Sequence, residues 1–420
     1  MEERVFPNLG ILDVATAQKS RGEDISLIDL CGSENPTQEI KDIANEFDIF
    51  GFSSTTPQFI ETHRLHQTLK EENPKAKTII GGAHPSAVYS LIQAGQSDDP
   101  NIAPLEEFDY IIVGEGENID MTSLKKGWNQ EPLIKKIDEL LIPDRSLIDL
   151  KSYKYNLKGN PATTIMSQRG CPFSCSFCCG REIEMYRKVR SKSPQKVLEE
   201  LDYLNSEFGF TSFMWFDDEV NVNPSRLKDL SNKLGKRGYS HRGFVRSDLL
   251  VKNPDTLDYL ADAGFVELCS GVESGSPEVL KRIGKGTTPE INSQAAQMIM
   301  NKGIDYKSFT IIGHPGETYE DIEKTKNWIK NNKPDGFDVT ILTPYPGSKL
   351  YDHSKPSTKH EGFDREWNGL FFKRIDYSSE ESFYKGKSGE YVCNVRTEEL
   401  RPKDLLKIRD EIEKDINTHQ

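Results

Sequence analysis

Cys171-Pro-Phe-Ser-Cys175-Ser-Phe-Cys178 is a short run that carries three cysteines, spaced four and three residues apart. Three thiolates at this spacing can hold three irons of an iron–sulfur cube and leave the fourth iron open for chemistry. Phe177, directly before the third cysteine, would shield such a cluster from water. We therefore predict that Cys171, Cys175 and Cys178 are the ligands of a [4Fe–4S] cluster.

Two other interpretations of these cysteines are weaker. A structural zinc site needs a fourth ligand close by, but Cys179 points elsewhere if Cys178 is a ligand, and the next histidine is His241. A disulfide knot would suit a secreted chain, and this sequence shows no secretory features. The other cysteines are scattered and are expected to be ordinary buried thiols: Cys31, Cys269 and Cys393.

The composition is that of a soluble protein. The chain has 420 residues, of which 35% are hydrophobic and 29% are charged, with a net charge of −13. This length allows two or three domains, and the acidic balance argues against a general nucleic-acid surface. We find no apolar run long enough to span a membrane, no signal peptide and no transit peptide. The sequence thus predicts a cytoplasmic protein that binds neither nucleic acid nor a membrane.

The segments beside the cysteines carry further information. Ser167-Gln-Arg-Gly170 before them and Tyr186-Arg-Lys-Val-Arg-Ser191 after them resemble the radical S-adenosylmethionine (SAM) enzymes that have an N-terminal cobalamin-binding domain. The resemblance covers nearly the whole chain. It implies that the open iron chelates SAM, and that one electron cleaves SAM to a 5′-deoxyadenosyl radical able to abstract hydrogen from an unactivated carbon.

Residues 1–125 alternate short apolar runs with helical patterns. Continuous apolar strands alternating with helices predict a doubly wound parallel sheet, whose ligands lie outside the carboxyl ends of the strands. The expected strands are 26–30, 49–53, 78–81 and 110–113, and the expected helices are 11–21, 58–72 and 84–94.

Polar and glycine-rich segments follow three of these strands. They are candidates for a ligand site because glycine lets the backbone approach a ligand closely, although tight turns alone would also use glycine. The segments resemble those of the cobalamin-binding domain in this family. The D-x-H-x-x-G signature, whose His ligates cobalt elsewhere, is absent, so the resemblance implies cobalt without a protein His. The candidate cobalamin residues are Ser53, Ser54, Thr55, Gly81, Gly82, His84, Pro85, Gly114, Glu115 and Gly116.

The beginning of the chain departs from the family pattern. Phe6-Pro-Asn-Leu-Gly10 looks like the segment that follows the family's first strand, and residues 1–5 are too short to supply a strand and a loop. We therefore expect a truncated first domain that lacks one element around its cofactor.

A connection at 126–160, with a small helix at 132–141, leads into a second strand–helix series at 161–355. Six strand–helix units are fewer than the eight of a closed barrel, and the resemblance likewise implies an open, partial (β/α)6 barrel. Residues 356–420 are expected to form a small α-rich tail that ends in an amphipathic helix at 402–416. The expected barrel strands are 163–168, 211–216, 242–246, 266–272, 308–313 and 338–345. Five helices should start where a capping side chain precedes a proline, at Ser193-Pro194, Asn223-Pro224, Asn253-Pro254, Ser276-Pro277 and Thr288-Pro289.

Residues that follow the barrel strands are candidates for SAM binding, because active sites of such folds lie at the carboxyl ends of the strands. The resemblance implies that Asp217 or Asp218 holds the SAM amino group, that Arg246 lies near its carboxylate or ribose, and that Glu273 accepts from the ribose hydroxyls. It also implies an adenine-contacting turn with Gly313 and Pro315, and Phe177 beside SAM. A solvated turn, a structural salt bridge and a surface glutamate remain the alternatives for the acidic pair, Arg246 and Glu273.

Two residues are candidates for a direct part in catalysis. His314 could donate a proton, although we expect a solvent-facing turn residue. Tyr345 could touch substrate or cofactor, although packing is the commoner role of an aromatic residue before a turn. Trp215, on the second barrel strand, is expected in the core.

Together these expectations favour C-methylation of a small metabolite or natural-product intermediate by a radical SAM enzyme that uses cobalamin. The first rival is radical SAM chemistry without methyl transfer, such as rearrangement, epimerisation, cyclisation or oxidation, which would form no S-adenosylhomocysteine. The second is a non-catalytic metal-binding protein with a closed cluster, which would not bind SAM. The expected partners are the small-molecule substrate and an electron donor such as flavodoxin or ferredoxin.

Overall fold

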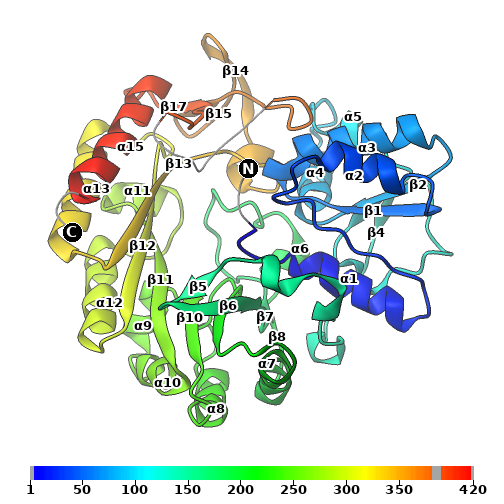
Figure 1. Ribbon diagram of the computed structural model, residues 1–420. Helices are drawn as coiled ribbons and strands as arrows, with labels where there is room; N and C mark the ends of the chain where they lie inside the picture. Colours follow the sequence, from blue (N-terminus) through cyan, green and yellow to red (C-terminus); the bar gives the residue numbers. More distant parts are fainter. Residues whose placement is uncertain (1–3, 381–388, 418–420) are drawn as a thin grey trace.

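The computed structural model describes residues 4–380 and 389–417, which form an N-terminal domain, a curled sheet and a C-terminal tail (Figure 1). The N-terminal domain is built on a parallel sheet in the order β1-β2-β3-β4, with helices on its faces. Its strands are β1 (Ile49–Ser53), β2 (Lys77–Gly81), β3 (Tyr110–Val113) and β4 (Gly127–Gln130), and its helices are α1 (Leu9–Ser20), α2 (Pro36–Ile43), α3 (Phe59–Glu72), α4 (Ala83–Gln93) and α5 (Ile102–Leu105).

Three segments of this part differ from the sequence-based expectation. Residues 26–30 form no strand, because the segment lies at the surface and the Asp29 and Cys31 carbonyls accept from the Arg4 side chain instead of a neighbouring strand. The fourth strand is β4, a partly buried polar segment that pairs with β3 beyond residue 125. The helix expected at 132–141 is only a short 3-10 turn, Ile137–Glu139.

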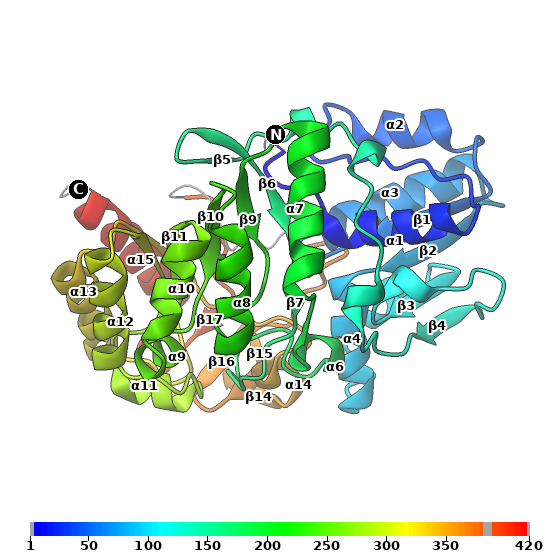
Figure 2. The same ribbon diagram turned by 90° about the horizontal axis from the view of Figure 1, so that it is seen from below.

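The second sheet has the order β13-β12-β11-β10-β9-β6-β5. Six of its strands are parallel and neighbour one another in chain order, and β5 pairs antiparallel with β6 at the edge. The sheet curls into an open half-barrel with its helices outside (Figure 2), which confirms the predicted partial barrel. The strands are β5 (Asn156–Leu157), β6 (Asn160–Ile165), β9 (Ser212–Trp215), β10 (Ser240–Phe244), β11 (Phe265–Glu273), β12 (Asp305–Ile312) and β13 (Gly336–Ile341).

The helices of the half-barrel begin mostly where the sequence predicts. Ser193, Asn223, Ser276 and Thr288 each accept a backbone N–H of the first helical turn, with proline next in the chain. The exception is Asn253, whose side chain does not cap the helix that begins at Asp255. The helices are α6 (Glu184–Arg187), α7 (Pro194–Phe208), α8 (Pro224–Leu234), α9 (Ser247–Lys252), α10 (Asp255–Ala263), α11 (Pro277–Arg282), α12 (Pro289–Asn301), α13 (Tyr319–Asn332) and α14 (Lys349–Asp352).

The tail contains the expected helix and a small sheet that the sequence did not predict. The helix is α15 (Pro402–Asn417), which buries Leu405, Ile408 and Ile412 and packs beside β13 (Figure 1). The antiparallel sheet before it has the order β14-β15-β16-β17. Its strands are β14 (Lys355–His360), β15 (Phe363–Trp367), β16 (Leu370–Phe372) and β17 (Val395–Arg396).

The tail also completes the core of the N-terminal domain. Ile375 and Tyr377 are buried against Phe59, Ile80 and Val88. The Asn101 side chain donates to the Ile375 carbonyl and accepts from the Tyr377 N–H, both at 2.9 Å. Among the residues described, no helix is long and apolar enough to cross a membrane.

Candidate active site

The cysteine segment lies between two short paired strands that follow β6. β7 (Gln168–Arg169) and β8 (Arg190–Ser191) are antiparallel and close the segment at its base. Inside it, the Ser176 N–H donates to the Ile283 carbonyl and the Leu350 N–H donates to the Ser176 carbonyl. The loop is therefore anchored to the ends of α11 and α14, on the side where the strands of the half-barrel end.

The three predicted ligands differ in exposure. Cys175 is buried, Cys171 is partly buried, and Cys178 and its neighbour Cys179 are exposed. Within the described residues, no three His, Cys, Asp or Glu side chains converge on a point that could hold a single metal ion. A [4Fe–4S] cube takes one thiolate on each of three different irons, so its ligands need not converge in that way. Of the three scattered cysteines, Cys269 is buried as expected, whereas Cys393 is partly buried and Cys31 is exposed.

The acidic turn after β9 holds three carboxylates in three environments. Asp217 is buried and accepts from the Ser167 N–H and hydroxyl and from the Gln168 N–H at 2.5–3.0 Å, so it fixes the chain before the cysteines. Asp218 accepts from the Gly170 N–H at 3.0 Å, and burial raises the pKa of its carboxyl to about 6.

Glu219 is the carboxylate that the sequence analysis did not select. Its Oε2 atom is buried and has no hydrogen-bond partner among the described residues. Burial raises the pKa of the Glu219 carboxyl to about 8, against the attraction of Lys285 and Arg246. Among the residues described, Glu219 is therefore the acid of this turn that keeps a buried oxygen free for a ligand.

Arg246 and Glu273 both belong to a polar cluster beside the cysteine loop. The Arg246 guanidinium lies 3.6 Å from the Phe173 ring centroid and 3.9 Å from Cys175 Sγ, donates to Asp248 at 2.8 Å and donates to the Lys285 carbonyl. Glu273 accepts from Lys285 Nζ at 2.7 Å, and both side chains are buried.

The backbone at Glu273 is strained, with a φ of +62° where the register of β11 with β12 shifts. Strain of this kind in a non-glycine residue persists only where the surroundings over-determine it, and it clusters at functional sites. Lys285, in the loop after α11, was not identified from the sequence because nothing in its local pattern marks it.

The turn that follows β12 is held from several sides. Glu317 accepts from the N–H groups of Gly313 and His314, at 2.5 and 3.1 Å. Arg282 donates to the Pro315 carbonyl at 2.6 Å, and the Thr397 hydroxyl of the tail donates to the Glu317 carbonyl at 2.8 Å. Gly313 and Pro315 thus lie in a rigid backbone turn, as binding of a base through backbone groups would require.

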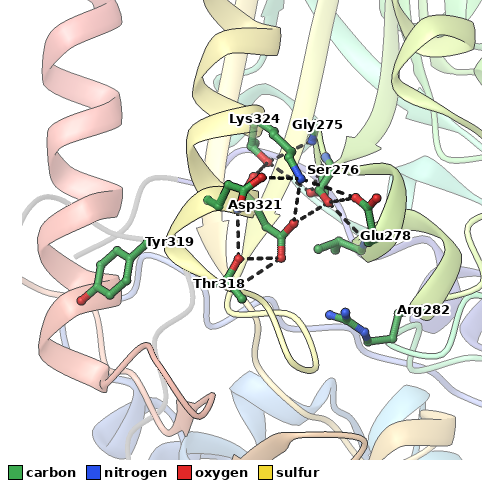
Figure 3. A network of polar contacts seen from close by, with 12 residues as sticks. Gly275, Ser276, Glu278, Arg282, Thr318, Tyr319, Asp321 and Lys324 are labelled. Carbon is green, nitrogen blue, oxygen red and sulfur yellow. Dashed lines mark hydrogen bonds and ion pairs between the residues drawn. The ribbon is translucent and has the colours of Figure 1, made fainter.

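Asp321 links the helices that follow two neighbouring strands (Figure 3). Its carboxylate accepts from the Ser276 hydroxyl at 2.6 Å, and Ser276 is the cap of α11. It also forms the capping box of α13 with Thr318. Lys324 lies beside these groups, 3.7 Å from Asp321 and 3.6 Å from Glu278. One carboxylate therefore fixes the start of α11 and of α13, on either side of the 313–317 turn.

His314 is not the solvent-facing residue that we expected. Its side chain is fully buried, 5.7 Å from the Phe177 ring, and neither ring nitrogen has a partner among the described residues. Burial, together with Arg282 and Lys285, lowers the pKa of His314 to about 3. The imidazole is therefore neutral near pH 7 and holds no extra proton to donate. The His314 ring lies beside Phe177, which is a candidate SAM contact. At that place it offers an apolar face and ring nitrogens that can form hydrogen bonds.

Tyr345 lies at the junction with the N-terminal domain. Its ring is 5.7 Å from that of Tyr377 and packs against the core that contains Phe59 and Ile80. The turn beyond it brings Gly347, with a φ of +82°, against the Cys179 carbonyl and Ala87 of α4, so tightly that an added Cβ would lie 2.5 Å from that carbonyl. Trp215 is in the core, as expected.

The three candidate cobalamin loops meet at the carboxyl ends of β1, β2 and β3. The Ser54 N–H donates to the Gly81 carbonyl and the His84 N–H donates to the Ser54 carbonyl, while the Gly114 N–H donates to the Ser86 hydroxyl. Ser53 ends β1, Thr55 is exposed, Gly82 precedes α4, Pro85 is buried within α4, and Gly116 lies between two buried glutamates.

Two of the candidate cobalamin side chains are already engaged inside the protein. The His84 imidazole packs 4.1 Å from the Phe59 ring and shares a hydrogen bond of 3.2 Å with Thr56. Glu115 accepts from Arg169 and Arg190. The buried ring of His84 is not available as a cobalt ligand, in agreement with the absent D-x-H-x-x-G signature.

Family models match both halves of this arrangement. Residues 165–329, with the cysteine loop and the strand-end residues described above, match the radical SAM superfamily. Residues 3–122, with the three loops of the first sheet, match the B12 binding domain. The chain is a radical SAM enzyme with a cobalamin-binding domain. Its cofactors are accordingly a [4Fe–4S] cluster, SAM and cobalamin.

Relatives of this radical SAM enzyme cover most of its chain. It is 28% identical over 372 residues to a protein of Pyrococcus horikoshii named uncharacterized methyltransferase PH0819. That alignment covers 83% of this chain and 78% of the relative. It is 26% identical over 348 residues to the anaerobic magnesium-protoporphyrin IX monomethyl ester cyclase of Rubrivivax gelatinosus, over 76% of this chain but only 60% of the relative.

A solved structure shares the fold of this radical SAM enzyme. The radical SAM methyltransferase TsrM from Kitasatospora setae, with cobalamin and a [4Fe–4S] cluster bound, aligns with a TM-score of 0.66 at 15% sequence identity. The alignment covers 82% of this chain and 74% of TsrM. The likeness establishes the order of the two domains and the half-barrel.

Proposed function

We propose that this radical SAM enzyme transfers a methyl group to a carbon centre of a small metabolite or natural-product intermediate. The observation that carries the proposal is the direct contact between its two cofactor-binding parts. The loop after β3, one of the candidate cobalamin loops, binds both ends of the cysteine segment through Glu115. A methyl group carried on the N-terminal domain would therefore face the mouth of the half-barrel.

The chain's own residues would hold the cofactors as follows. Cys171, Cys175 and Cys178 bind the cluster, and Arg246 contacts the loop at Phe173 and Cys175. Glu219, with Asp218 next to it, takes the SAM amino group, Glu273 takes the ribose, and the turn with Gly313 and Pro315 takes adenine beside Phe177 and His314. When bound, the cluster with SAM supplies a 5′-deoxyadenosyl radical and cobalamin supplies a methyl group.

The names of relatives give further support. PH0819 and TsrM are both named methyltransferases. The substrate is expected to be a small molecule, and the electron is expected to come from a flavodoxin or a ferredoxin. Tyr345 packs at the domain junction, so we assign it a part in shaping the substrate space between the domains.

One observation favours a second candidate function. The Rubrivivax relative, which aligns with 76% of this chain, is named a cyclase and not a methyltransferase. Rearrangement, epimerisation, cyclisation or oxidation without methyl transfer is therefore the alternative.

The two functions differ in their products. The test is anaerobic reconstitution with iron, sulfide and hydroxocobalamin, followed by metal analysis and turnover with SAM. Cobalt bound beside iron, and S-adenosylhomocysteine formed together with 5′-deoxyadenosine, would support methyl transfer. Formation of 5′-deoxyadenosine alone would support the alternative. Cys175→Ala should abolish SAM cleavage but leave cobalamin bound, whereas Cys179→Ala should keep the cluster.

A further inference from the structure

Glu115 binds both ends of the segment that carries the cysteines. β7 and β8 pair Arg169 with Arg190 and so close residues 170–189 into a loop. Glu115 Oε1 accepts from Arg169 Nη1 at 2.8 Å, and Glu115 Oε2 accepts from Arg190 Nη1. One carboxylate of the N-terminal domain thus contacts both the entry and the exit of the cysteine segment.

The contact is buried and almost fully satisfied. The side chains of Glu115 and Arg190 are 6% and 7% exposed, and that of Arg169 is 16% exposed. The Ile134 N–H also donates to Glu115 Oε2, at 2.9 Å. Removing one partner from a buried, charge-assisted pair leaves the other charge without compensation, so such a contact is hard to break.

The charges at this junction are divided between the two domains. The N-terminal domain supplies the carboxylates and the β7–β8 pair supplies the guanidinium groups. Arg169 also contacts Asp13 at 3.0 Å and Glu117 at 2.6 Å. Among the carboxylates that the structure describes here, Glu115 is the one that contacts both arginines and so joins the two ends of the cysteine segment to the N-terminal domain.

We propose that Glu115 is a positioning residue that couples occupation of the cobalamin loops to the geometry of the cluster loop. Glu115 stands between Gly114 and Gly116 in one of those loops, so a ligand that moves the loop moves both arginines with it. The coupling to cobalamin rests on the proposed function, whereas the contact with the cysteine segment does not. Thermodynamic linkage then requires cobalamin to change the affinity for SAM, and SAM to change the affinity for cobalamin by the same factor.

Two variants separate this role from simple domain docking. Glu115→Gln keeps the size of the side chain but has one acceptor oxygen, and its NH2 group would face a guanidinium, so it cannot serve both arginines. Glu117→Gln is the matched control, because Glu117 is a buried carboxylate of the same loop that contacts Arg169 and not Arg190. Arg190→Met removes the exit contact from the other side.

The experiment uses the full chain reconstituted with its cluster. Dissociation constants for SAM are measured with and without hydroxocobalamin, and amide hydrogen exchange is followed over residues 171–189. In the wild type, hydroxocobalamin should change the SAM dissociation constant by about fivefold or more. Glu115→Gln and Arg190→Met should reduce this ratio towards one and speed exchange in the segment about tenfold, whereas Glu117→Gln should keep most of the ratio.

Each possible result of this experiment supports or overturns one of the two proposals. A ratio near one in the wild type, or a Glu115→Gln variant that keeps the wild-type ratio, overturns the coupling. If the wild type takes up no hydroxocobalamin, the methyl-transfer proposal fails instead, and exchange in the cobalamin-free protein still tests Glu115. Equal exchange over residues 171–189 in Glu115→Gln and Glu117→Gln would then show that Glu115 only docks the domains.

Discussion

The three carboxylates at 217–219 show how neighbouring side chains of one chemical type acquire different functions. The Asp217 carboxylate accepts three hydrogen bonds from the chain before the cysteines, and the Asp218 carboxylate accepts one from the Gly170 N–H. Glu219 keeps a buried oxygen without a partner among the described residues. A buried acceptor in this state is costly until a ligand satisfies it, so the energetics favour Glu219 as the SAM contact.

At about pH 9, where the Glu219 carboxyl with its pKa of about 8 is ionised, Glu219→Gln should weaken SAM binding by about tenfold, because a charge-assisted hydrogen bond to the amino group contributes about 1.5–3 kcal/mol. The iron content should stay unchanged, since Glu219 is not one of the proposed cluster ligands. Equilibrium dialysis of the reconstituted protein with SAM measures the effect. Unchanged SAM affinity together with weaker binding in Asp218→Asn would assign the amino group to Asp218.

Gly170→Ala should prevent the cysteine loop from closing. Gly170 has a φ of +89°, and an added Cβ would lie 2.2 Å from the Lys188 carbonyl. Gly159→Ala is the matched control, because Gly159 has a φ of +81° and no atom within 4 Å of an added Cβ. The control should lose only about 1–2 kcal/mol of stability from its backbone conformation. Iron bound per chain should fall steeply in Gly170→Ala, and equal iron in both variants would contradict the expectation.

At the scale of helices and strands, the accuracy of the sequence analysis followed the strength of the local signal. The strands at 49–53 and 110–113 have the predicted bounds because continuous apolar runs end there at turn residues. Four of the helix caps before proline were also right. The segment 26–30 has a similar apolar pattern but lies at the surface, and β4 is too polar to be recognised by its pattern.

The candidate site was predictable only where it is local in sequence. The cysteine loop and the turns after the strands were identified, because each is a short motif. Lys285, and the pairing of Glu115 with Arg169 and Arg190, depend on segments far apart in the chain. His314 was misjudged because its burial beside Phe177, which is far away in the chain, leaves no trace in the residues next to it.

Asp321→Ala should destabilise two helices at once. The change removes the capping box of α13 and the acceptor of Ser276, the cap of α11. Ser276 and Thr318 stay in place as the caps, but each loses its hydrogen bond to the Asp321 carboxylate. At about 1 kcal/mol for each lost bond, unfolding should be easier by about 2 kcal/mol. Glu320→Ala is the control, since the Glu320 side chain is 81% exposed and contacts Lys324 alone among the described residues. Urea unfolding measures both, and equal losses would mean that Asp321 does not act on two helices.

At the scale of the whole molecule, buried histidines make stability depend on pH. Burial lowers the pKa of His84, His241 and His314 to about 3 each. The unfolded chain binds a proton at these residues below about pH 6.5, whereas the folded chain does not until about pH 3. Above about pH 6.5 these histidines therefore do not lower the free energy of unfolding. As the pH falls from about 6.5 towards 3, the free energy of unfolding decreases.

His84→Gln should make the protein less sensitive to acid. Between pH 7 and pH 5 the wild type should lose about 2 kcal/mol through His84, from a gap of about 1.5 pH units at 1.36 kcal/mol per unit. The variant lacks this loss, so the stability difference between the two proteins should shrink by that amount at pH 5. Urea unfolding of both proteins at the two pH values measures it, and a constant difference would contradict the buried, neutral state of His84.

The contacts that α14 and the tail make with the N-terminal domain have a consequence for synthesis on the ribosome. Ser90 of α4 donates to Asp352, and Asn101 binds residues 375 and 377, so these contacts join parts of the chain that are 262 to 276 residues apart. At translation rates of 5–20 residues per second, the later partner emerges about 13–55 s after the earlier one. During that interval the apolar surface around Phe59 and Val88 has no Ile375 or Tyr377 to cover it, which makes the nascent first domain a natural client for chaperones.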